Sequence, residues 1–417
     1  MIGTCACRLC GATLGAPFLA LGPSPVSNAF LTEADLARPE PFFPLDVHFC
    51  EACALVQVPD IAGTLFDDHY VYFSSFSASW LAHARRYCDA IGARLGLDSR
   101  SFVVEVASND GYLLQNLVAR GIPVLGVEPT ANTAAAAVAR GVPTEVAFFG
   151  RDTARRIVER HRRADLVIAN NVLAHVPDLA DFVDGFALLL ADDGTATFEF
   201  PHLLNLVAET QFDTIYHEHY SYLSVLTARR LFARHGLEIW DIEELPTHGG
   251  SLRLYVGHAG KHAPRPIVDA IVAREIAAGL DRRDTYERFA AEVGRVRDDL
   301  VAFLRGARQA GEKVVGYGAP AKGNTLLNYC RVTPELLPFT VDRSPHKQGR
   351  FLPGTHVPVL TPEALFEARP DYVLILPWNL KDEIAAQLAG IAAWGGQLVV
   401  PIPRLAFAPA GPSGLAS

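Results

Sequence analysis

Short apolar runs alternate with segments of helical periodicity through the middle of the chain. Residues 101–105 are largely apolar, residues 107–111 are small and polar, and three leucines follow at helical spacing within 113–117. This order predicts a buried strand, a tight turn and the start of a helix. The alternation continues with strands predicted at 122–129, 164–171 and 195–201 and a helix at 179–190. Strands that alternate with helices favour a parallel α/β sheet.

A second α/β unit is predicted in the last part of the chain. Residues 312–318 predict a strand and a glycine turn, and a helix is expected after Gly323. Residues 272–304 lie between the two units and are rich in charged side chains at helical spacing, which predicts long helices that act as a spacer. Later strands are expected at 339–342, 372–376 and 397–400. We therefore expect an α/β protein with domains at residues 1–68, 69–300 and 301–417.

The turn at residues 107–111 is a candidate cofactor site, because backbone N–H groups at a helix start can face a ligand. The dinucleotide fingerprint requires three glycines and only Gly111 is present, so ordinary strand-to-helix packing is an equal alternative for the turn alone. Glu128, at the end of the next strand, could accept hydrogen bonds from ribose hydroxyls. Such a site suits S-adenosylmethionine (SAM) at least as well as NAD. The candidate cofactor residues are Glu105, Ala107, Asn109, Asp110, Gly111, Glu128, Phe148 and Asn171, with Phe148 and Phe149 as possible walls for an adenine.

Four cysteines predict a metal site near the N-terminus. Cys7 and Cys10 form one Cys-x-x-Cys pair, and Cys50 and Cys53 form another. Four thiolates complete a tetrahedral zinc site with no open position for catalysis, so the zinc is expected to be structural. Cys5 lies beside the first pair and could compete with Cys7 as a ligand.

Composition narrows the classes of partner. The 417 residues are 50% hydrophobic, with a net charge of −9 and a pI near 5.9, which argues against a nucleic-acid partner. The sequence contains no apolar stretch of about eighteen residues and begins without a charged-then-apolar leader. We therefore expect a cytoplasmic enzyme that associates with neither nucleic acid nor a membrane.

Polar and aromatic clusters suggest where chemistry takes place. Asn171 and His175 follow a strand, at the sheet edge where α/β proteins bind ligands, although a single histidine is often a surface residue. The densest cluster lies at 212–222, where a helical spacing would place Tyr216 and His219 on one face. A structural polar network and a histidine metal site are the alternatives there. Tyr70, in an aromatic segment before the sheet, is more often a core residue but could also cover a ligand.

The glycine-rich segments suggest a second ligand site. Glycines at 316 and 318 would let the backbone approach a phosphate, and Lys322 could supply a positive charge. A second α/β unit that binds nothing is the alternative. The candidate substrate residues are Lys322, Asn324, Tyr317 and His248.

Taken together, these motifs resemble those of the deoxysugar C-methyltransferases. The shared segments are the two cysteine pairs, EVASNDG at 105–111, NNVLAHVPD at 170–178, YHEHYSYLS at 216–224, HGGSLR at 248–253 and GYGAPAKGN at 316–324. The resemblance covers nearly the whole chain and implies a zinc-binding domain, a SAM domain and a C-terminal Rossmann-like domain that helps to bind a nucleotide sugar. It implies methylation of a ring carbon of a dTDP-4-keto-deoxysugar, and it places the family's active-site residues at Tyr70, His175, Tyr216, Glu218 and His219.

The implied reaction removes a proton next to a ketone and methylates the resulting enolate. We expect His219 to take the proton, Glu218 to orient the histidines, Tyr216 and His175 to steady the enolate, and Tyr70 to position the sugar. C-3 is the favoured carbon and C-5 the second choice. The alternatives are a nicotinamide-dependent oxidoreductase that uses residues 316–323, a nucleic-acid methyltransferase or zinc-ribbon binding module, and an O- or N-methyltransferase of the same fold.

Overall fold

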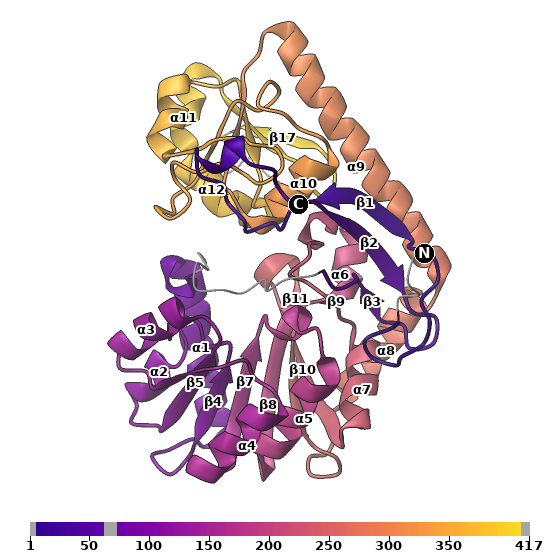
Figure 1. Cartoon of the computed structure of the whole chain (residues 1–417), viewed down its shortest axis with the longest axis vertical. Coiled ribbons are helices and arrows are strands. Elements are labelled where there is room, and N and C mark those ends of the chain that lie inside the picture. Colours follow the sequence, from indigo (N-terminus) through magenta and orange to yellow (C-terminus); the bar gives the residue numbers. More distant parts are fainter. Residues whose placement is uncertain (1–5, 62–72, 410–417) are drawn as a thin grey trace.

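The computed structural model describes residues 6–61 and 73–409, which form three β-sheets with helices around two of them (Figure 1). A four-stranded sheet lies near the N-terminus, a seven-stranded sheet forms the middle unit and a six-stranded sheet forms the C-terminal unit. This arrangement confirms the α/β class with an additional N-terminal domain. Tyr70 lies outside the described residues.

The N-terminal sheet includes a strand from the middle of the sequence. Its order is β1 (Leu19–Ser24), β2 (Phe43–Phe49), β3 (Val56–Gln57) and β9 (Ser221–Tyr222), with antiparallel pairing throughout. In the last pairing, Val56 lies opposite Tyr222 and Gln57 opposite Ser221. Because β9 follows His219 closely, the cysteine-rich domain holds the polar cluster at 212–222 directly.

The middle sheet has its topological switch between β4 and β7. On one side of the switch the strands follow in the order β4, β5, β6, and on the other side in the order β7, β8, β11, β10. β11 is antiparallel to both of its neighbours, β8 and β10. Ligands bind outside the carboxyl ends of strands at such a switch. The strands are β4 (Val103–Val106), β5 (Val124–Glu128), β6 (Thr144–Val146), β7 (Ala164–Asn170), β8 (Leu190–Pro201), β10 (Leu237–Leu245) and β11 (Ser251–His258).

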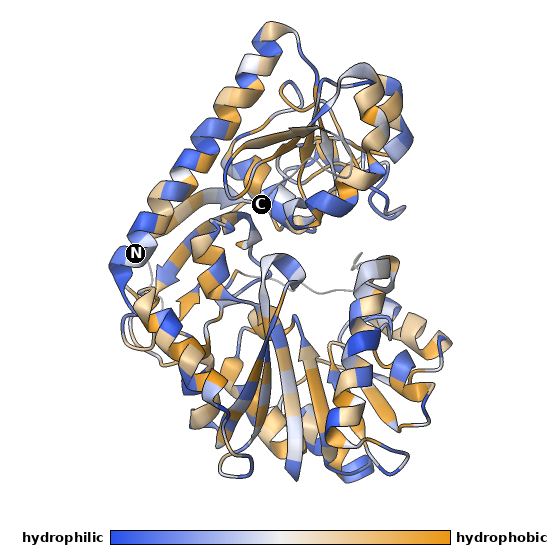
Figure 2. Ribbon diagram, turned by 180° about the vertical axis from the view of Figure 1, so that it is seen from behind, coloured by the Kyte–Doolittle hydropathy of each residue, from blue (hydrophilic) through white to orange (hydrophobic). Residues whose placement is uncertain are grey.

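Apolar strands and amphipathic helices give this unit its core (Figure 2). α1 begins where Ser77 Oγ accepts a hydrogen bond from Trp80 N (3.3 Å) and ends at Gly96, whose φ is 64°. The helix expected from residue 113 is reduced to α2, because turns continue from residue 107 to 114. The helices are α1 (Ala78–Leu95), α2 (Gln115–Val118), α3 (Ala131–Ala139), α4 (Arg151–Arg160), α5 (Leu179–Leu189), α6 (Leu203–Ala208), α7 (Val225–Arg234) and α8 (Pro266–Ala277).

The C-terminal sheet is parallel except for its last strand. Its order is β14 (Val359–Leu360), β13 (Thr340–Val341), β12 (Val314–Tyr317), β15 (Tyr372–Ile375), β16 (Gln397–Val400) and β17 (Ala406–Pro409). The helices of this unit are α10 (Ala321–Tyr329), α11 (Pro362–Ala368) and α12 (Lys381–Gln387). α10 begins two residues before Gly323, so Lys322 and Asn324 lie in its first turn.

A single long helix, α9 (Arg283–Ala310), connects the middle and C-terminal units along one side of the molecule (Figure 1). Its buried face carries Tyr286, whose ring packs against Phe18 and Phe49 of the N-terminal domain at 5.0 and 4.7 Å. The expected division at residue 300 falls inside this helix. Among the described residues, no helix combines the length and the apolar character that a membrane span requires.

Candidate active site

The four cysteines of the two pairs come together. Their sulfur atoms all lie within 4.8 Å of one another, with Cys7 Sγ and Cys53 Sγ 3.5 Å apart and Cys10 Sγ and Cys50 Sγ also 3.5 Å apart. A tetrahedral zinc site with Zn–S bonds of about 2.3 Å has sulfur–sulfur edges of about 3.8 Å, so the cluster fits zinc. Cys5 lies outside the described residues.

The turn after β4 has an unusual backbone. Ala107, Asn109 and Gly111 all have positive φ angles, of 54°, 49° and 76°. Non-glycine residues in this region cost free energy and cluster at ligand sites. Gly111 also permits close packing, because a Cβ there would lie 3.0 Å from Val142 Cγ2.

Glu128 closes the turn from the neighbouring strand. Its carboxylate accepts a hydrogen bond from Asn109 N at 2.9 Å and further bonds from Thr130 N and Oγ1 at 3.0 and 2.6 Å. Glu105 lies below the turn and is 1% exposed. Burial raises its pKa well above the ordinary value, and the carboxylates of Glu128 and Asp110 add to the increase.

Buried polar atoms without partners gather at this switch point. Among the described residues, the affected atoms are Glu105 Oε2, Ser108 Oγ, Asp110 Oδ1, Asn170 Oδ1 and Asn171 Oδ1. Buried polar groups are normally hydrogen-bonded, so this group fits a polar ligand such as SAM. Asn171 has a φ of 54° and its backbone N donates to Glu199 O at 2.7 Å, which holds it at the end of β7.

The contacts of two residues bear on the cofactor predictions. Asp110, a candidate SAM contact, forms an ion pair with Arg140 through its Oδ2 at 2.8 Å. Phe149 packs inward against Phe182 and Phe186, with ring centroids 5.6 and 5.1 Å apart, and is not a wall for adenine. Phe148 is 62% exposed and keeps that role as a candidate.

Tyr216 and His219 meet through a turn, not through a helix. His219 N donates to Tyr216 O at 2.9 Å, and the Tyr216 hydroxyl lies 2.8 Å from His219 Nε2. His219 Nδ1 lies 2.9 Å from Thr214 O, an atom that can only accept, so Nδ1 carries the proton. Burial, with the fields of His175, His248 and Lys322, holds the pKa of His219 well below its ordinary value. His219 is therefore neutral, and its Nε2 presents a lone pair to the Tyr216 hydroxyl.

His175 lies beside this pair in the same tautomer. Its Nδ1 donates to Glu218 O at 2.6 Å, and its ring packs edge-on against His219 with centroids 4.5 Å apart. Burial lowers the pKa of His175 to about 4. His175 is therefore neutral at neutral pH.

Glu218 does not orient the histidines through its carboxylate, as the sequence had suggested. Its Oε1 accepts hydrogen bonds from Asn28 N and Nδ2 at 3.2 and 3.0 Å, in the N-terminal domain. Its backbone carbonyl accepts from His175 Nδ1 at 2.6 Å. Burial raises the pKa of the Glu218 carboxyl group.

The substrate predictions divide into two groups. Lys322 and His248 are half-buried and interact electrostatically with each other, and burial, reinforced by the Lys322 charge, lowers the pKa of His248 to about 4. Asn324 is 1% exposed and donates to Ser27 O at 2.6 Å, and the Tyr317 hydroxyl donates to Gln387 Oε1 at 2.7 Å. Asn324 and Tyr317 therefore join parts of the protein, and their role as ligand contacts stays a prediction.

Sequence reasoning missed a neighbouring group. Trp80 of α1 packs its ring against His83 and against the edge of His248, at 4.9 and 5.1 Å. His83 Nε2 lies 3.0 Å from both carboxylate oxygens of Glu199, which also pairs with Arg253 at 2.6 Å. The available signal was a single glutamate within the apolar strand at 195–201.

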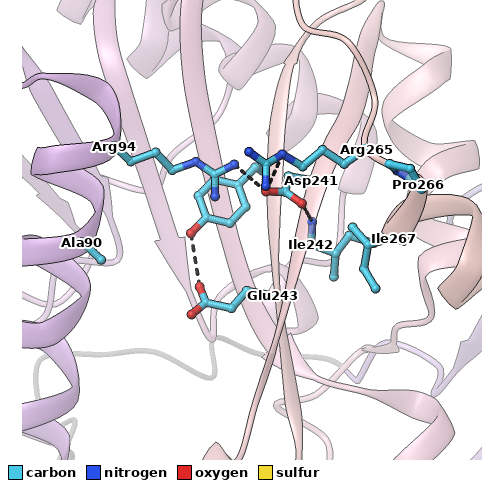
Figure 3. Close-up of a pocket in the computed structure, with 9 residues that line it drawn as sticks. Ala90, Arg94, Asp241, Ile242, Glu243, Arg265, Pro266 and Ile267 are labelled. Carbon is cyan, nitrogen blue, oxygen red and sulfur yellow. Dashed lines mark hydrogen bonds and ion pairs between the residues drawn. The ribbon is translucent and has the colours of Figure 1, made fainter.

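A pocket of about 520 Å³ lies elsewhere, between α1, β10 and the start of α8 (Figure 3). Its charged groups neutralise one another, since Asp241 pairs with both Arg94 and Arg265, and the Tyr255 hydroxyl donates to Glu243 at 3.2 Å. None of the predicted site residues lines it. The lining residues are Ala90, Arg94, Asp241, Ile242, Glu243, Tyr255, Arg265, Pro266 and Ile267.

Known proteins resemble the chain along nearly its whole length. Three family models match it in order: a zinc binding domain at residues 7–64, a methyltransferase domain at 80–242 and a C-methyltransferase C-terminal domain at 246–403. The C-methyltransferase NovU of Streptomyces niveus is 37% identical over 404 residues, which cover 95% of each protein. This chain belongs to the C-methyltransferase family. It is a SAM-dependent enzyme with one structural zinc, and its methyl acceptor is a small molecule.

Two solved methyltransferase structures resemble part of this C-methyltransferase. Magnesium protoporphyrin IX methyltransferase from Synechocystis PCC 6803 is 14% identical with a TM-score of 0.33, covering 43% of this chain and 82% of that chain. A SAM-dependent methyltransferase from Clostridium acetobutylicum ATCC 824 is 10% identical with a TM-score of 0.34, covering 42% and 91%.

Proposed function

We propose that this C-methyltransferase acts on a dTDP-4-keto-deoxysugar and methylates the carbon next to the ketone, with C-3 favoured, through an enolate. The observation that supports this most strongly is the turn at Tyr216 and His219, which holds a neutral imidazole with its Nε2 lone pair toward a phenol. Methylation of carbon requires removal of a carbon-bound proton, and a neutral imidazole of this kind is a base.

Removal of that proton is the difficult step. A ketone α-proton is about ten pKa units less acidic than an ordinary imidazolium, which leaves about 14 kcal/mol at 1.36 kcal/mol per unit, and the lowered pKa of His219 adds to this cost. A base alone does not supply this free energy. Groups that stabilise the developing oxyanion and hold the acceptor in place must supply the rest.

Each group has a role in this scheme. His219 Nε2 takes the proton, either directly after the Tyr216 hydroxyl moves aside or through that hydroxyl. Thr214 O stabilises the imidazolium that forms, because it accepts from Nδ1 at 2.9 Å. His175 packs against His219 and shields it from water. SAM, when bound, supplies an electrophilic methyl group on a positive sulfonium.

The acceptor is a nucleotide sugar in this proposal. Lys322 and His248 supply polar groups from the C-terminal and middle units, while Trp80 supplies an aromatic surface. Tyr70 is proposed to contact the sugar on the ground of its motif alone. Glu128, Asn109 and Asn171 are proposed to contact SAM.

Product analysis tests the function. The enzyme is incubated with SAM and a panel of dTDP-4-keto sugars, and the products are examined by mass spectrometry and NMR. We expect a mass gain of one methylene and a methyl signal on C-3. A methyl group on oxygen, or unchanged sugars throughout the panel, would overturn the proposal.

A further inference from the structure

A buried carboxylate and a lysine face each other where the middle and C-terminal units meet. Asp213 is fully buried in η4 (Phe212–Thr214), and its Oδ2 accepts from Trp378 Nε1 at 2.7 Å. Lys322 Nζ lies 4.4 Å above the centroid of the Trp378 ring and donates to Asn379 Oδ1 at 2.7 Å. Asp213 Oδ1 has no hydrogen-bond partner among the described residues. Trp378 thus lies between the two charges and contacts both.

The same elements hold the proposed base. Thr214, the last residue of η4, provides the carbonyl that accepts from His219 Nδ1 at 2.9 Å. α10, which carries Lys322, contacts the next residue, because Thr325 Oγ1 donates to Ile215 O at 2.9 Å. The position of Lys322 is therefore fixed relative to His219.

Trp378 also contacts the turn of His248. A Cβ at Gly249 would lie 2.7 Å from Trp378 Cη2, so the ring lies directly against the residue that follows His248. Lys322 is in electrostatic range of both His219 and His248. The Trp378 ring therefore links Lys322 to the turn of His248, and the charge of Lys322 lowers the pKa of both histidines.

His175 and His219 do not provide a donor for an oxyanion. His175 and His219 each direct Nδ1–H to a backbone carbonyl, so each Nε2 can only accept. The Tyr216 hydroxyl directs its proton to His219. A developing enolate needs a donor or a positive charge at its oxygen. Lys322 carries both.

We propose that Lys322 is a catalytic residue that donates a hydrogen bond to the oxygen of the developing enolate, and that Asp213 is a positioning residue that keeps this ammonium charged. The inference rests on the proposed function. In this step the C–H bond breaks and the proton passes to His219. The C–H electron pair forms the new C=C bond, and the carbonyl π pair moves to oxygen. Lys322 keeps its protons.

Asp213 counteracts the effect of the Lys322 charge on the protonation of His219. When His219 accepts the proton, it becomes a cation near a second cation, which is unfavourable in a buried site. The carboxylate of Asp213 offsets this repulsion. Asp213 also favours the charged form of Lys322. Burial lowers the pKa of Lys322, and the Asp213 carboxylate raises it.

Hydrogen exchange without methyl transfer tests the proposal. The full chain with S-adenosylhomocysteine and a dTDP-4-keto sugar is placed in deuterated water, and loss of the α-proton is followed by NMR. We expect Lys322→Met to lower the saturated exchange rate about 100-fold or more, the usual cost of one oxyanion donor, with little change in KM. Lys322→Arg should recover at least part of the rate, and Asp213→Asn should lower kcat without raising KM. Lys313→Met, an exposed lysine in the same unit, is the control.

The outcomes separate this inference from the proposed function. If the wild-type enzyme exchanges no proton in any keto sugar, the proposed function fails and the inference fails with it. If the wild type exchanges and Lys322→Met exchanges at the same saturated rate with a raised KM, Lys322 binds the diphosphate and the inference alone fails. Zinc content and SAM binding show whether each variant is folded. If Asp213→Asn does not fold, the Lys322 variants alone test the catalytic role of Lys322.

Discussion

Two backbone carbonyls determine which nitrogen of each active-site histidine is basic. Thr214 O and Glu218 O each accept from an Nδ1–H, which leaves Nε2 of His219 and of His175 as lone-pair sites. The sequence indicated the residue types, but the tautomers depend on where a turn places two carbonyl oxygens. For the same reason it assigned the orienting role to the Glu218 carboxylate, whereas the Glu218 backbone performs it.

The Tyr216 hydroxyl lies 2.8 Å from the basic nitrogen of His219. Tyr216→Phe removes the hydroxyl through which the proton passes to Nε2 and leaves the ring packing intact, so we expect kcat to fall about 100-fold, while SAM affinity stays unchanged. Steady-state kinetics and calorimetry measure both. Tyr220→Phe is the matched control, because its ring contact with Arg8 does not need the hydroxyl. Near wild-type kcat in Tyr216→Phe would remove Tyr216 from the reaction.

The buried His175 makes stability depend on pH. Its pKa is about 4 in the folded chain and 6.5 ordinarily, so between these values the unfolded chain binds a proton that the folded chain does not. The stability that His175 contributes therefore falls as the pH falls, by about 2 kcal/mol from pH 7 to pH 5. His175→Asn keeps an N–H donor and cannot be protonated there. In urea unfolding, the loss of stability between pH 7 and pH 5 should be about 2 kcal/mol smaller for His175→Asn than for the wild type. His161→Asn, a control at an exposed site, should lose as much stability as the wild type.

At the scale of elements, the turn at residues 107–111 shows what a pattern can predict. The strand, the turn and the following apolar residues are present, because burial and small side chains decide them locally. The helix after the turn is only four residues long, and three positive φ angles within the turn are the reason. The sequence pattern marked Gly111 but gave no sign that Ala107 and Asn109 share its conformation.

Substitution of Gly111 by alanine should cost more stability than the same substitution at Gly141, which has a similar backbone conformation. Gly111→Ala places a Cβ 3.0 Å from Val142 Cγ2 at a φ of 76°, whereas Gly141→Ala has a φ of 80° and no atom within 4 Å. Gly141→Ala should cost about 1–2 kcal/mol of stability through its backbone alone. Gly111→Ala should cost roughly 1–3 kcal/mol more and weaken SAM binding. Denaturation and calorimetry measure these effects, and equal costs would contradict the packing argument.

The zinc site should control the active site through two short strands. Gln57 of β3 donates to Cys7 Sγ at 3.2 Å, and β3 pairs with β9, which follows His219. Removal of zinc with a chelator should lower the melting temperature and the activity together, and added zinc should restore both if the chain refolds. His175→Asn and Tyr216→Phe should each retain one zinc per chain by metal analysis. Loss of zinc in either variant would place the metal in the active site.

At the scale of the molecule, the three units meet at a polar junction that the sequence could not reveal. Asn28 binds Glu218, and Asn324 binds the neighbouring Ser27, across separations of 190 and 297 residues. The glycine-rich motif at 316–324 suggested that Asn324 contacts a ligand, because the local pattern contains no information about the loop that covers it. The order of the units followed from the sequence, but their contacts did not.

The contributions of Asn28 and Glu218 to stability should be coupled. Asn28→Ala removes the Nδ2 donor and leaves the buried Glu218 Oε1 with the Asn28 backbone N–H alone, so we expect a loss of about 1–3 kcal/mol. Glu218→Gln should also destabilise the chain, and the double variant should lose less than the sum of the two. Chemical denaturation of the four proteins in this cycle gives the coupling energy. Strict additivity would show that the contact does not hold the units together.

The most direct test of the account concerns His219 as the base. His219→Asn and the wild-type enzyme are each incubated with S-adenosylhomocysteine and a dTDP-4-keto sugar in deuterated water, and the α-proton is followed by NMR. We expect the wild type to exchange the proton and the variant to exchange it at least 100-fold more slowly, because general base catalysis contributes about 10²–10⁴-fold. Exchange at the wild-type rate in a folded, zinc-containing His219→Asn protein would contradict the central claim.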